Sequence, residues 1–306
     1  MINLYTHPIC LDHEMHPGHP ERPARLAAVL DYLHASGLAS ELTLREPAPA
    51  PQKLLARVHT QGHLDMLQSA SPASGLVQLD PDTLMNPASH AAASMAAGAV
   101  VDATRDVIDG ACKSAFCAVR PPGHHAERRS AMGFCLYNSI AAGADFALDC
   151  DGIERVAILD FDVHHGNGTV DIFQDREEVL VCSSFQYPHY PYRLQDLDRP
   201  NLVHTPLAAG TSGFEFRRAI ERDWLPALDA HQPQIILVSA GFDAHAADPL
   251  GDLRLVEDDF RWITDLIVGA ARASAGGRIV SALEGGYDLD ALARSVGAHI
   301  EGLLAA

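Results

Sequence analysis

The run from Asp160 to Gly168, Asp-Phe-Asp-Val-His-His-Gly-Asn-Gly, concentrates carboxylates and imidazoles directly after the apolar stretch 156–159. That stretch predicts a buried strand. Asp162 and His164 are two positions apart, so on an extended backbone their side chains point to the same face. A carboxylate and an imidazole on one face are suited to binding a metal ion together. We therefore predict a metal site at the end of this strand.

A third ligand is predicted far downstream, where the apolar stretch 234–240 is followed by Gly-Phe and then Asp243. Asp162, His164 and Asp243 would form a three-ligand site with open positions, which is typical of a catalytic zinc. Two carboxylates and one imidazole also suit Fe²⁺, so the residue types leave the choice of metal open. The alternative for each segment alone is that the carboxylates are helix N-caps and His164 is a buried, hydrogen-bonded histidine. The two segments together favour the metal.

Two more loops that follow apolar stretches carry groups suited to catalysis. The first, which runs from Arg120 through Pro-Pro-Gly, places His124 and His125 side by side. A neutral imidazole beside a metal site can act as a general base. In the second loop, two glycines precede Tyr287, so that the chain can turn sharply and present a phenol to a developing oxyanion. Each loop alone is a weak signal, whereas the four segments together are specific.

The four segments resemble the motifs of the zinc-dependent histone deacetylase and acetylpolyamine amidohydrolase superfamily. These motifs are Pro-Pro-Gly-His-His, Asp-x-Asp-x-His-His-Gly, Gly-Phe-Asp and Glu-Gly-Gly-Tyr. The similarity covers nearly the whole chain, including residues 16–25, 79–83 and 133–138. Asn167, where class I members carry Asp, is similar to the class II-like, bacterial-type branch.

The resemblance implies one catalytic Zn²⁺ ion, with Fe²⁺ as the alternative, bound by Asp162, His164 and Asp243. It implies that His125 is the general base, that His124 is its electrostatic partner and that Tyr287 is the oxyanion donor. Asn167 would stand behind His125, and Asp160 would orient His124. It also implies a structural K⁺ ion beneath the zinc, with the ligands Asp160, Asp162, His164 and Ser183.

The resemblance further implies a substrate tunnel, in which Gly133, Phe134 and Tyr190 line the acyl chain and Asp80 accepts the substrate backbone N–H. Leu250 stands at a gatekeeper position, where polyamine-selective relatives carry glutamate. An apolar side chain cannot offset the desolvation of a cation, but it can pack against the stem of an acyl-lysine. The rim segment 187–201 has no glycine, whereas the family's loop is glycine-rich, so we expect a rim of different shape.

Apolar strand-like stretches alternate with helical patterns along the chain. We expect strands at residues 2–6, 42–45, 115–120, 156–161, 179–185, 202–207, 234–240 and 278–283. We expect helices that include residues 23–36, 87–108, 215–230, 258–273 and 289–304. This alternation predicts an α/β fold with a mostly parallel sheet covered on both faces, and ligands beyond the carboxyl ends of its strands. The resemblance implies a three-layer αβα, arginase/deacetylase-like fold with a central, mostly parallel eight-stranded sheet.

Length and composition narrow the classes of protein. A chain of 306 residues with 47% hydrophobic content predicts a single deacetylase-like catalytic domain over residues 1–306. The start lacks a basic region followed by an apolar one, and no apolar run has membrane-spanning length, so secretion and membrane insertion are disfavoured. Six cysteines without C-x-x-C spacing are typical of thiols in a reducing cytoplasm. The formal net charge of −18 argues against a nucleic-acid partner and suits cationic substrates, although it more commonly serves solubility.

The leading hypothesis is a zinc-dependent amidohydrolase that removes an acyl group from acetyl-lysine, in a peptide or as a small acylated amine. One alternative is an acetylpolyamine amidohydrolase. Another is a binuclear manganese ureohydrolase, which expects a further carboxylate where Gly166 stands. A non-catalytic acyl-lysine binder is disfavoured because the expected catalytic groups are all present. The sequence does not decide the length of the acyl group or whether the chain forms a homo-oligomer.

Overall fold

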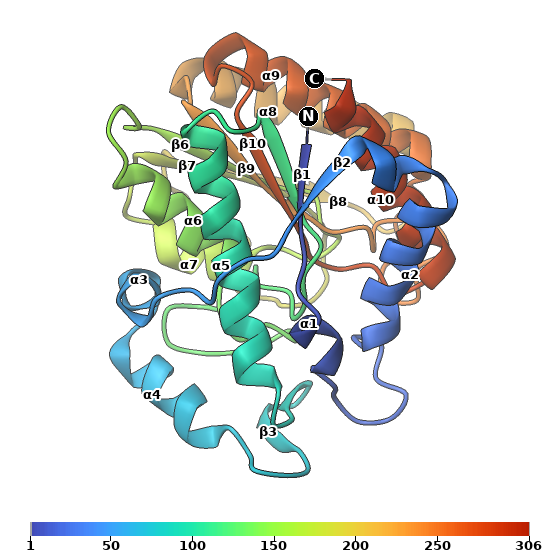
Figure 1. Cartoon of the computed structure of the whole chain (residues 1–306). Coiled ribbons are helices and arrows are strands. Elements are labelled where there is room, and N and C mark those ends of the chain that lie inside the picture. The colour runs from blue at the N-terminus through green and yellow to red at the C-terminus, as the bar shows by residue number, and fades with distance from the viewer. Residues whose placement is uncertain (1, 306) are drawn as a thin grey trace.

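The computed structural model describes residues 2–305 and is built around one eight-stranded sheet (Figure 1). In chain order the strands are β1 (Ile2–Tyr5), β2 (Leu42–Arg45), β5 (Ser114–Cys117), β6 (Val156–Asp160), β7 (Val179–Gln186), β8 (Leu202–Leu207), β9 (Ile235–Ala240) and β10 (Ile279–Leu283). Their order in the sheet is β2-β1-β5-β10-β9-β6-β7-β8, and every neighbouring pair is parallel. All eight predicted strands are present, and the predicted fold class is confirmed.

The central strands are buried along their whole length and mostly apolar, because both faces of the sheet are covered. Every residue of β5, β6, β9 and β10 is buried. Parallel sheets with helices on both faces require such continuous apolar strands. The edge strand β2 differs, since Leu44 is 67% exposed.

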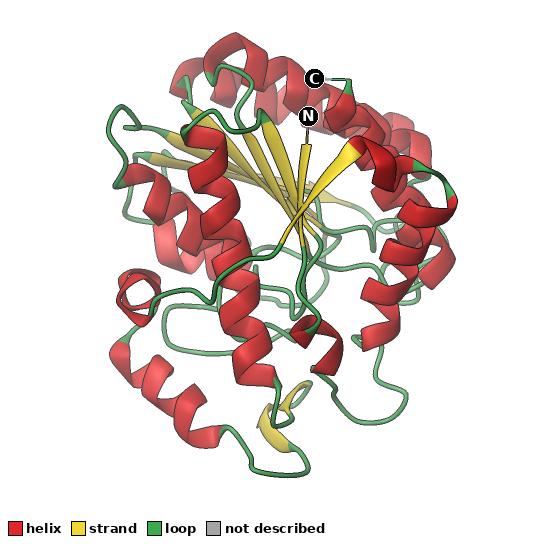
Figure 2. Cartoon of the chain, in the orientation of Figure 1, coloured by secondary structure: helices red, strands yellow, loops and turns green. Residues whose placement is uncertain are grey.

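Two groups of helices cover the sheet and complete the three layers (Figure 2). In one group, α2 (Pro23–Ala35), α10 (Leu289–Leu304), α9 (Glu257–Ser274) and α8 (Gly213–His231) contact one another in that order. In the other, α5 (Ser89–Ile108), α6 (Ser139–Leu148) and α7 (Asn167–Phe173) contact one another in series. The five predicted helices are present, with ends within two residues of the expected ones.

The carboxyl ends of the strands meet at the lower edge of the sheet in Figure 1, where the loops of the site begin. β9 lies between β6 and β10, so the loops that follow these three strands are neighbours. The same end of the molecule carries smaller elements that were not predicted: α1 (Ile9–Asp12), α3 (Gln52–Val58), α4 (Gln61–Ala70), β3 (Val77–Asp80) and β4 (Thr83–Met85). A 3₁₀ helix, Leu38–Glu41, precedes β2.

All six cysteines are free, and five of them are buried. Among residues 2–305, no helix combines the length and the apolar character needed to cross a membrane.

Candidate metal centre and active site

Asp162, His164 and Asp243 come together just beyond the ends of the neighbouring strands β6 and β9. One candidate ligand atom from each residue lies within 4.8 Å of the others. Nδ1 of His164 lies 3.0 Å from Oδ1 of Asp162 and 3.2 Å from Oδ2 of Asp243. All three residues are buried. Within residues 2–305, no other three His, Cys, Asp or Glu residues lie close enough together to hold a metal ion.

The chemistry of this group fits a divalent metal ion. Oδ2 of Asp243 is buried and makes no hydrogen bond of good geometry, although Nδ1 of His164 lies 3.2 Å from it. The backbone N–H of Val163 donates to Oδ1 of Asp243 at 2.8 Å, and that of Gly285 donates to Oδ2 of Asp162 at 2.8 Å. A Cβ atom at Gly241 or Gly285 would overlap these carboxylates, so both positions need glycine. Two carboxylates held by amides, with an imidazole beside them, form a donor set suited to Zn²⁺ or Fe²⁺.

His124 and His125 lie next to the ligands, with ring centroids 4.0 Å apart. Burial alone would lower the pKa of His124, but the charges of Asp160 and Asp162 raise that pKa well above its usual range. Burial and the neighbouring charges of His124 and His164 hold the pKa of His125 well below its usual range. These opposite shifts favour the charged form of the first imidazole and the neutral form of the second.

Each histidine meets the residue that the resemblance implied. Nδ1 of His124 lies 2.9 Å from Oδ2 of Asp160, at the end of β6. Nδ1 of His125 lies 2.7 Å from Oδ1 of Asn167, the first residue of α7. Through these contacts β6 and α7 orient the loop that follows β5.

Tyr287 reaches the same cavity from the loop after β10. Its backbone N–H donates to Oδ2 of Asp248 at 2.6 Å, and Cζ of Arg25 lies 4.8 Å from the centre of its ring. Burial raises the pKa of the Tyr287 phenol well above its usual range. The hydroxyl therefore remains protonated and can donate a hydrogen bond.

A cavity of about 220 Å³ brings the catalytic and substrate-binding candidates together. It is lined by Asp82, His125, Gly133, Phe134, His164, His189, Tyr190, Leu250 and Tyr287. Four of the five predicted substrate-binding residues belong to this lining. The fifth, Asp80, does not line it; its Oδ1 accepts the backbone N–H of Asp82 at 3.0 Å. Ser183, the predicted potassium ligand on β7, is buried and pairs in register with Asp160.

Several residues of the site were not predicted. Asp82 lies on the cavity wall, and burial together with Asp80 raises its pKa to about 6. The two aspartates stand in one Asp-Pro-Asp run, so the run was a signal but did not tell which aspartate faces the cavity. Glu284 is buried and accepts the backbone N–H of Gly123 at 2.7 Å and of His124 at 3.1 Å. It thereby joins the histidine loop to the tyrosine loop.

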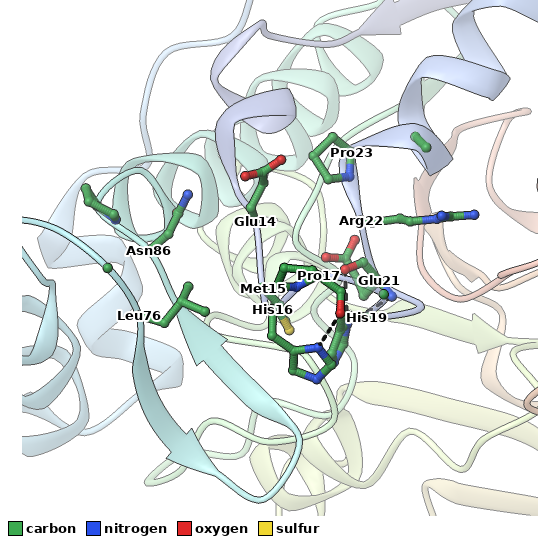
Figure 3. A pocket seen from close by; sticks show the side chains of 14 residues that line it. Glu14, Met15, His16, Pro17, His19, Glu21, Arg22, Pro23, Leu76 and Asn86 are labelled. Carbon is green, nitrogen blue, oxygen red and sulfur yellow. Dashed lines mark hydrogen bonds between the residues drawn. The ribbon is translucent and has the colours of Figure 1, made fainter.

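A larger cavity, of about 670 Å³, lies apart from the metal ligands, beside the segment that leads into α2 (Figure 3). Glu14, His16 and Arg22 line it, together with Leu76 and Asn86 from the region of the β3–β4 hairpin. None of the metal ligands or catalytic candidates belongs to its lining. The metal centre therefore lies in the smaller of these two cavities.

Comparisons with known proteins agree with this geometry. The histone deacetylase domain family matches residues 19–303. The chain is 39% identical over 277 residues to the histone deacetylase-like amidohydrolase of Pseudomonas aeruginosa, which covers 88% of this chain and 73% of that protein. It is 35% identical over 298 residues to a probable deacetylase of Archaeoglobus fulgidus, which covers 95% of this chain and 82% of that protein. The crystal structure of the HDA15 HD domain matches with a TM-score of 0.93 and 33% identity, covering 99% of this chain and 88% of that one. The chain therefore belongs to the histone deacetylase family and is an enzyme of the deacetylase and amidohydrolase type.

Proposed function

We propose that this enzyme is a zinc-dependent deacylase that hydrolyses the amide of acetyl-lysine, in a peptide or a small acylated amine. The observation that carries the proposal is the buried trio Asp162, His164 and Asp243, of which His164 lines the same cavity as His125 and Tyr287. When bound, the ion would supply Lewis acidity for the acyl carbonyl and for water. Zn²⁺ is the proposed ion, and the same donors suit Fe²⁺.

In this proposal the two histidines have different tasks. His125 is neutral, so it can take a proton from water and later deliver it to the departing amine. His124 keeps its proton because Asp160 lies against it, and its positive charge stabilises negative charge in the transition state. Tyr287 donates its hydroxyl proton in a hydrogen bond to the developing oxyanion.

The substrate would enter along the wall formed by Gly133, Phe134 and Tyr190, with Leu250 at the entrance. Asp82 is better placed than Asp80 to accept the substrate backbone N–H, because Asp82 lines the cavity, whereas the Asp80 carboxylate accepts the backbone N–H of Asp82. The rim, without glycine in residues 187–201, contributes His189, whose ring stacks 5.1 Å from that of His164. These contacts favour an acyl chain on an extended, apolar stem.

The test is metal analysis joined to an activity screen. The purified protein should contain about one transition-metal ion per chain, chelation should abolish hydrolysis of an acetyl-lysine peptide, and Zn²⁺ or Co²⁺ should restore it. Two Mn²⁺ ions with hydrolysis of arginine or agmatine would instead identify a ureohydrolase. Binding of acetyl-lysine peptides without turnover by the metal-loaded protein would identify a non-catalytic binder.

A structural K⁺ ion near Asp160 and Ser183 is part of the same proposal. Because such an ion would bind the folded chain and not the unfolded one, KCl should raise the melting temperature more than choline chloride does at equal ionic strength. Equal melting temperatures in the two salts would argue against the potassium site.

A further inference from the structure

The side-chain amide of Asn167 supports His125, and the oxygen and nitrogen of such an amide occupy almost the same space. Oδ1 accepts hydrogen bonds and Nδ2 donates them, so the direction in which Asn167 points decides what His125 can do. In the structure, Oδ1 of Asn167 lies 2.7 Å from Nδ1 of His125, and Nδ2 donates to Oε1 of Glu127 at 2.8 Å. We propose that Glu127 is a positioning residue for the catalytic base, which it controls by fixing the orientation of Asn167. The inference rests on the proposed function, in which His125 is that base.

Glu127 is built to hold this orientation. It is 5% exposed, and its Oε2 accepts a hydrogen bond from the Ser130 hydroxyl at 3.1 Å. Nη2 of Arg193, from the rim segment, lies 3.0 Å from the same oxygen. The backbone is also tied down, because the Glu127 carbonyl oxygen lies 2.9 Å from Nδ1 of His59. Since a buried carboxylate is costly unless it is paired, these partners keep an ionised acceptor in a fixed place.

The ionised carboxylate permits only one direction of the amide. A flipped Asn167 would turn its oxygen toward Glu127, which would place two acceptors at hydrogen-bond distance with no proton between them. The flipped amide would also turn an N–H toward Nδ1 of His125, so that the imidazole proton would move to Nε2. An imidazole protonated at Nε2 cannot accept a proton there. Glu127 therefore selects the tautomer in which Nδ1 carries the proton and Nε2 is the base.

The same contact explains why residue 167 is an amide. An aspartate there would bring a second carboxylate to within about 2.8 Å of the Glu127 oxygen, and two like charges at that distance repel strongly. In this chain the carboxylate of Glu127 does not contact the His125 imidazole directly. It contacts the amide of Asn167, and the amide contacts the imidazole.

Four variants test the inference by steady-state kinetics on an acetyl-lysine peptide: Glu127→Ala, Glu127→Gln, Asn167→Asp and the double variant Asn167→Asp/Glu127→Gln. Glu127→Ala should lower kcat by roughly tenfold or more with KM changed less than about twofold, because the geometry of the base is lost while substrate contacts remain. Glu127→Gln should lie between this variant and the wild type, because a glutamine can accept or donate. Asn167→Asp alone should also lose activity. The double variant should recover most of the lost kcat, because the introduced glutamine amide can donate to the introduced carboxylate.

Recovery in the double variant is the decisive result. If the two single substitutions only damaged the structure, their losses of kcat would add in the double variant. Glu154→Gln is the matched control: this glutamate side chain is 81% exposed, and its substitution should leave kcat unchanged. Additive losses with no recovery in the double variant would overturn the inference.

A second measurement does not depend on activity. ¹⁵N NMR of the imidazole nitrogens should find the His125 proton on Nδ1 in the wild-type protein and a population on Nε2 in Glu127→Ala. An unchanged tautomer in Glu127→Ala would overturn the inference, even in a protein that hydrolyses no acyl-lysine. A wild-type protein with the expected tautomers but no turnover would instead refute the proposed function.

Discussion

Two adjacent imidazoles can differ in protonation only if their surroundings differ, and the surroundings of His124 and His125 differ in charge. The carboxylate of Asp160 helps to raise the pKa of His124, whereas the amide of Asn167 places no charge beside His125, whose pKa is lowered by burial and by the neighbouring charges of His124 and His164. In the proposed mechanism, the carboxylate behind His124 and the amide behind His125 contribute to the different tasks of a fixed positive charge and a base.

The hydroxyl of Tyr287 should act on the transition state and little on the bound substrate. Tyr287→Phe should lower kcat by roughly 10²-fold or more with little change in KM, because the oxyanion appears only during the reaction. Steady-state kinetics would measure both constants, with Tyr187→Phe, at an exposed tyrosine of the rim, as the control. An unchanged kcat would remove Tyr287 from the mechanism.

Leu250 should set the preference between acyl-lysine and acetylated polyamine. We expect kcat/KM for an acetyl-lysine peptide to exceed that for acetylspermidine, because a leucine cannot stabilise the distal ammonium ion. Leu250→Glu should narrow the gap, and Leu250→Gln, of the same size without the charge, should narrow it much less. A wild-type preference for acetylspermidine would refute the assignment of Leu250 and favour a polyamine deacetylase.

At the scale of elements, one histidine joins two helices and a strand. His299 of α10 lies with Nδ1 2.6 Å from the hydroxyl oxygen of Thr264 on α9 and with Nε2 2.8 Å from that of Ser281 on β10. It is fully buried, and burial lowers its pKa to about 3. The packing of these three elements therefore requires a neutral imidazole.

This requirement predicts how stability depends on pH. Above about pH 6.5 His299 is neutral in the folded and unfolded chains and contributes no pH dependence; between that pH and about 3, only the unfolded chain takes up the proton. The free energy of unfolding should then fall with decreasing pH by about 1.4 kcal/mol per unit from this residue. Urea unfolding at pH 7.5 and pH 5 measures how much the free energy of unfolding falls between these pH values. This fall should be about 2 kcal/mol smaller in His299→Gln than in the wild type.

The exposed His34 provides the control for this experiment, because His34→Gln should leave the loss unchanged. The metal ligands titrate alike in all these variants, so the difference isolates His299. An equal loss in His299→Gln and the wild type would contradict the assignment.

The elements differ in how far the sequence alone could reveal them. The strands were predictable because burial on both faces makes them nearly continuous apolar runs, as in residues 235–238. The helix α6 was not among those predicted. Eight of its ten residues are buried, so it shows no polar face with a helical period. The short helices α3 and α4 span only seven and ten residues, too few for a strong periodic signal.

The site shows the same division. Asp162 and His164 are predictable as a pair because their spacing alone places them on one face. Glu127 gave no such signal, because its significance depends on Asn167, which lies 40 positions away along the chain. Contacts of this kind arise from tertiary packing and leave no local pattern.

At the scale of the whole molecule, the last strand in the chain order of the sheet, β10, lies in the interior of the sheet. β10 pairs with β5 on one side and β9 on the other, and these two strands are not paired with each other. Val280→Pro, in this central strand, should lower the free energy of unfolding by about 4 kcal/mol or more, because its ladder hydrogen bonds have no substitute. Leu44→Pro, in the edge strand β2, should cost less than about 2 kcal/mol. Chemical denaturation would measure both, and equal losses would refute a central role for β10.

The position of β10 has a consequence for biosynthesis. While the ribosome is still translating the chain, β2-β1-β5 and β9-β6-β7-β8 can form only as two half-sheets, each with an open edge. The strand that joins them emerges last, and Tyr287 follows it directly. A chain that stops early therefore holds the three metal ligands without the phenol and without a closed sheet. A prematurely terminated chain should therefore expose unpaired sheet edges and be degraded. It should not persist in the cell as a partly active hydrolase.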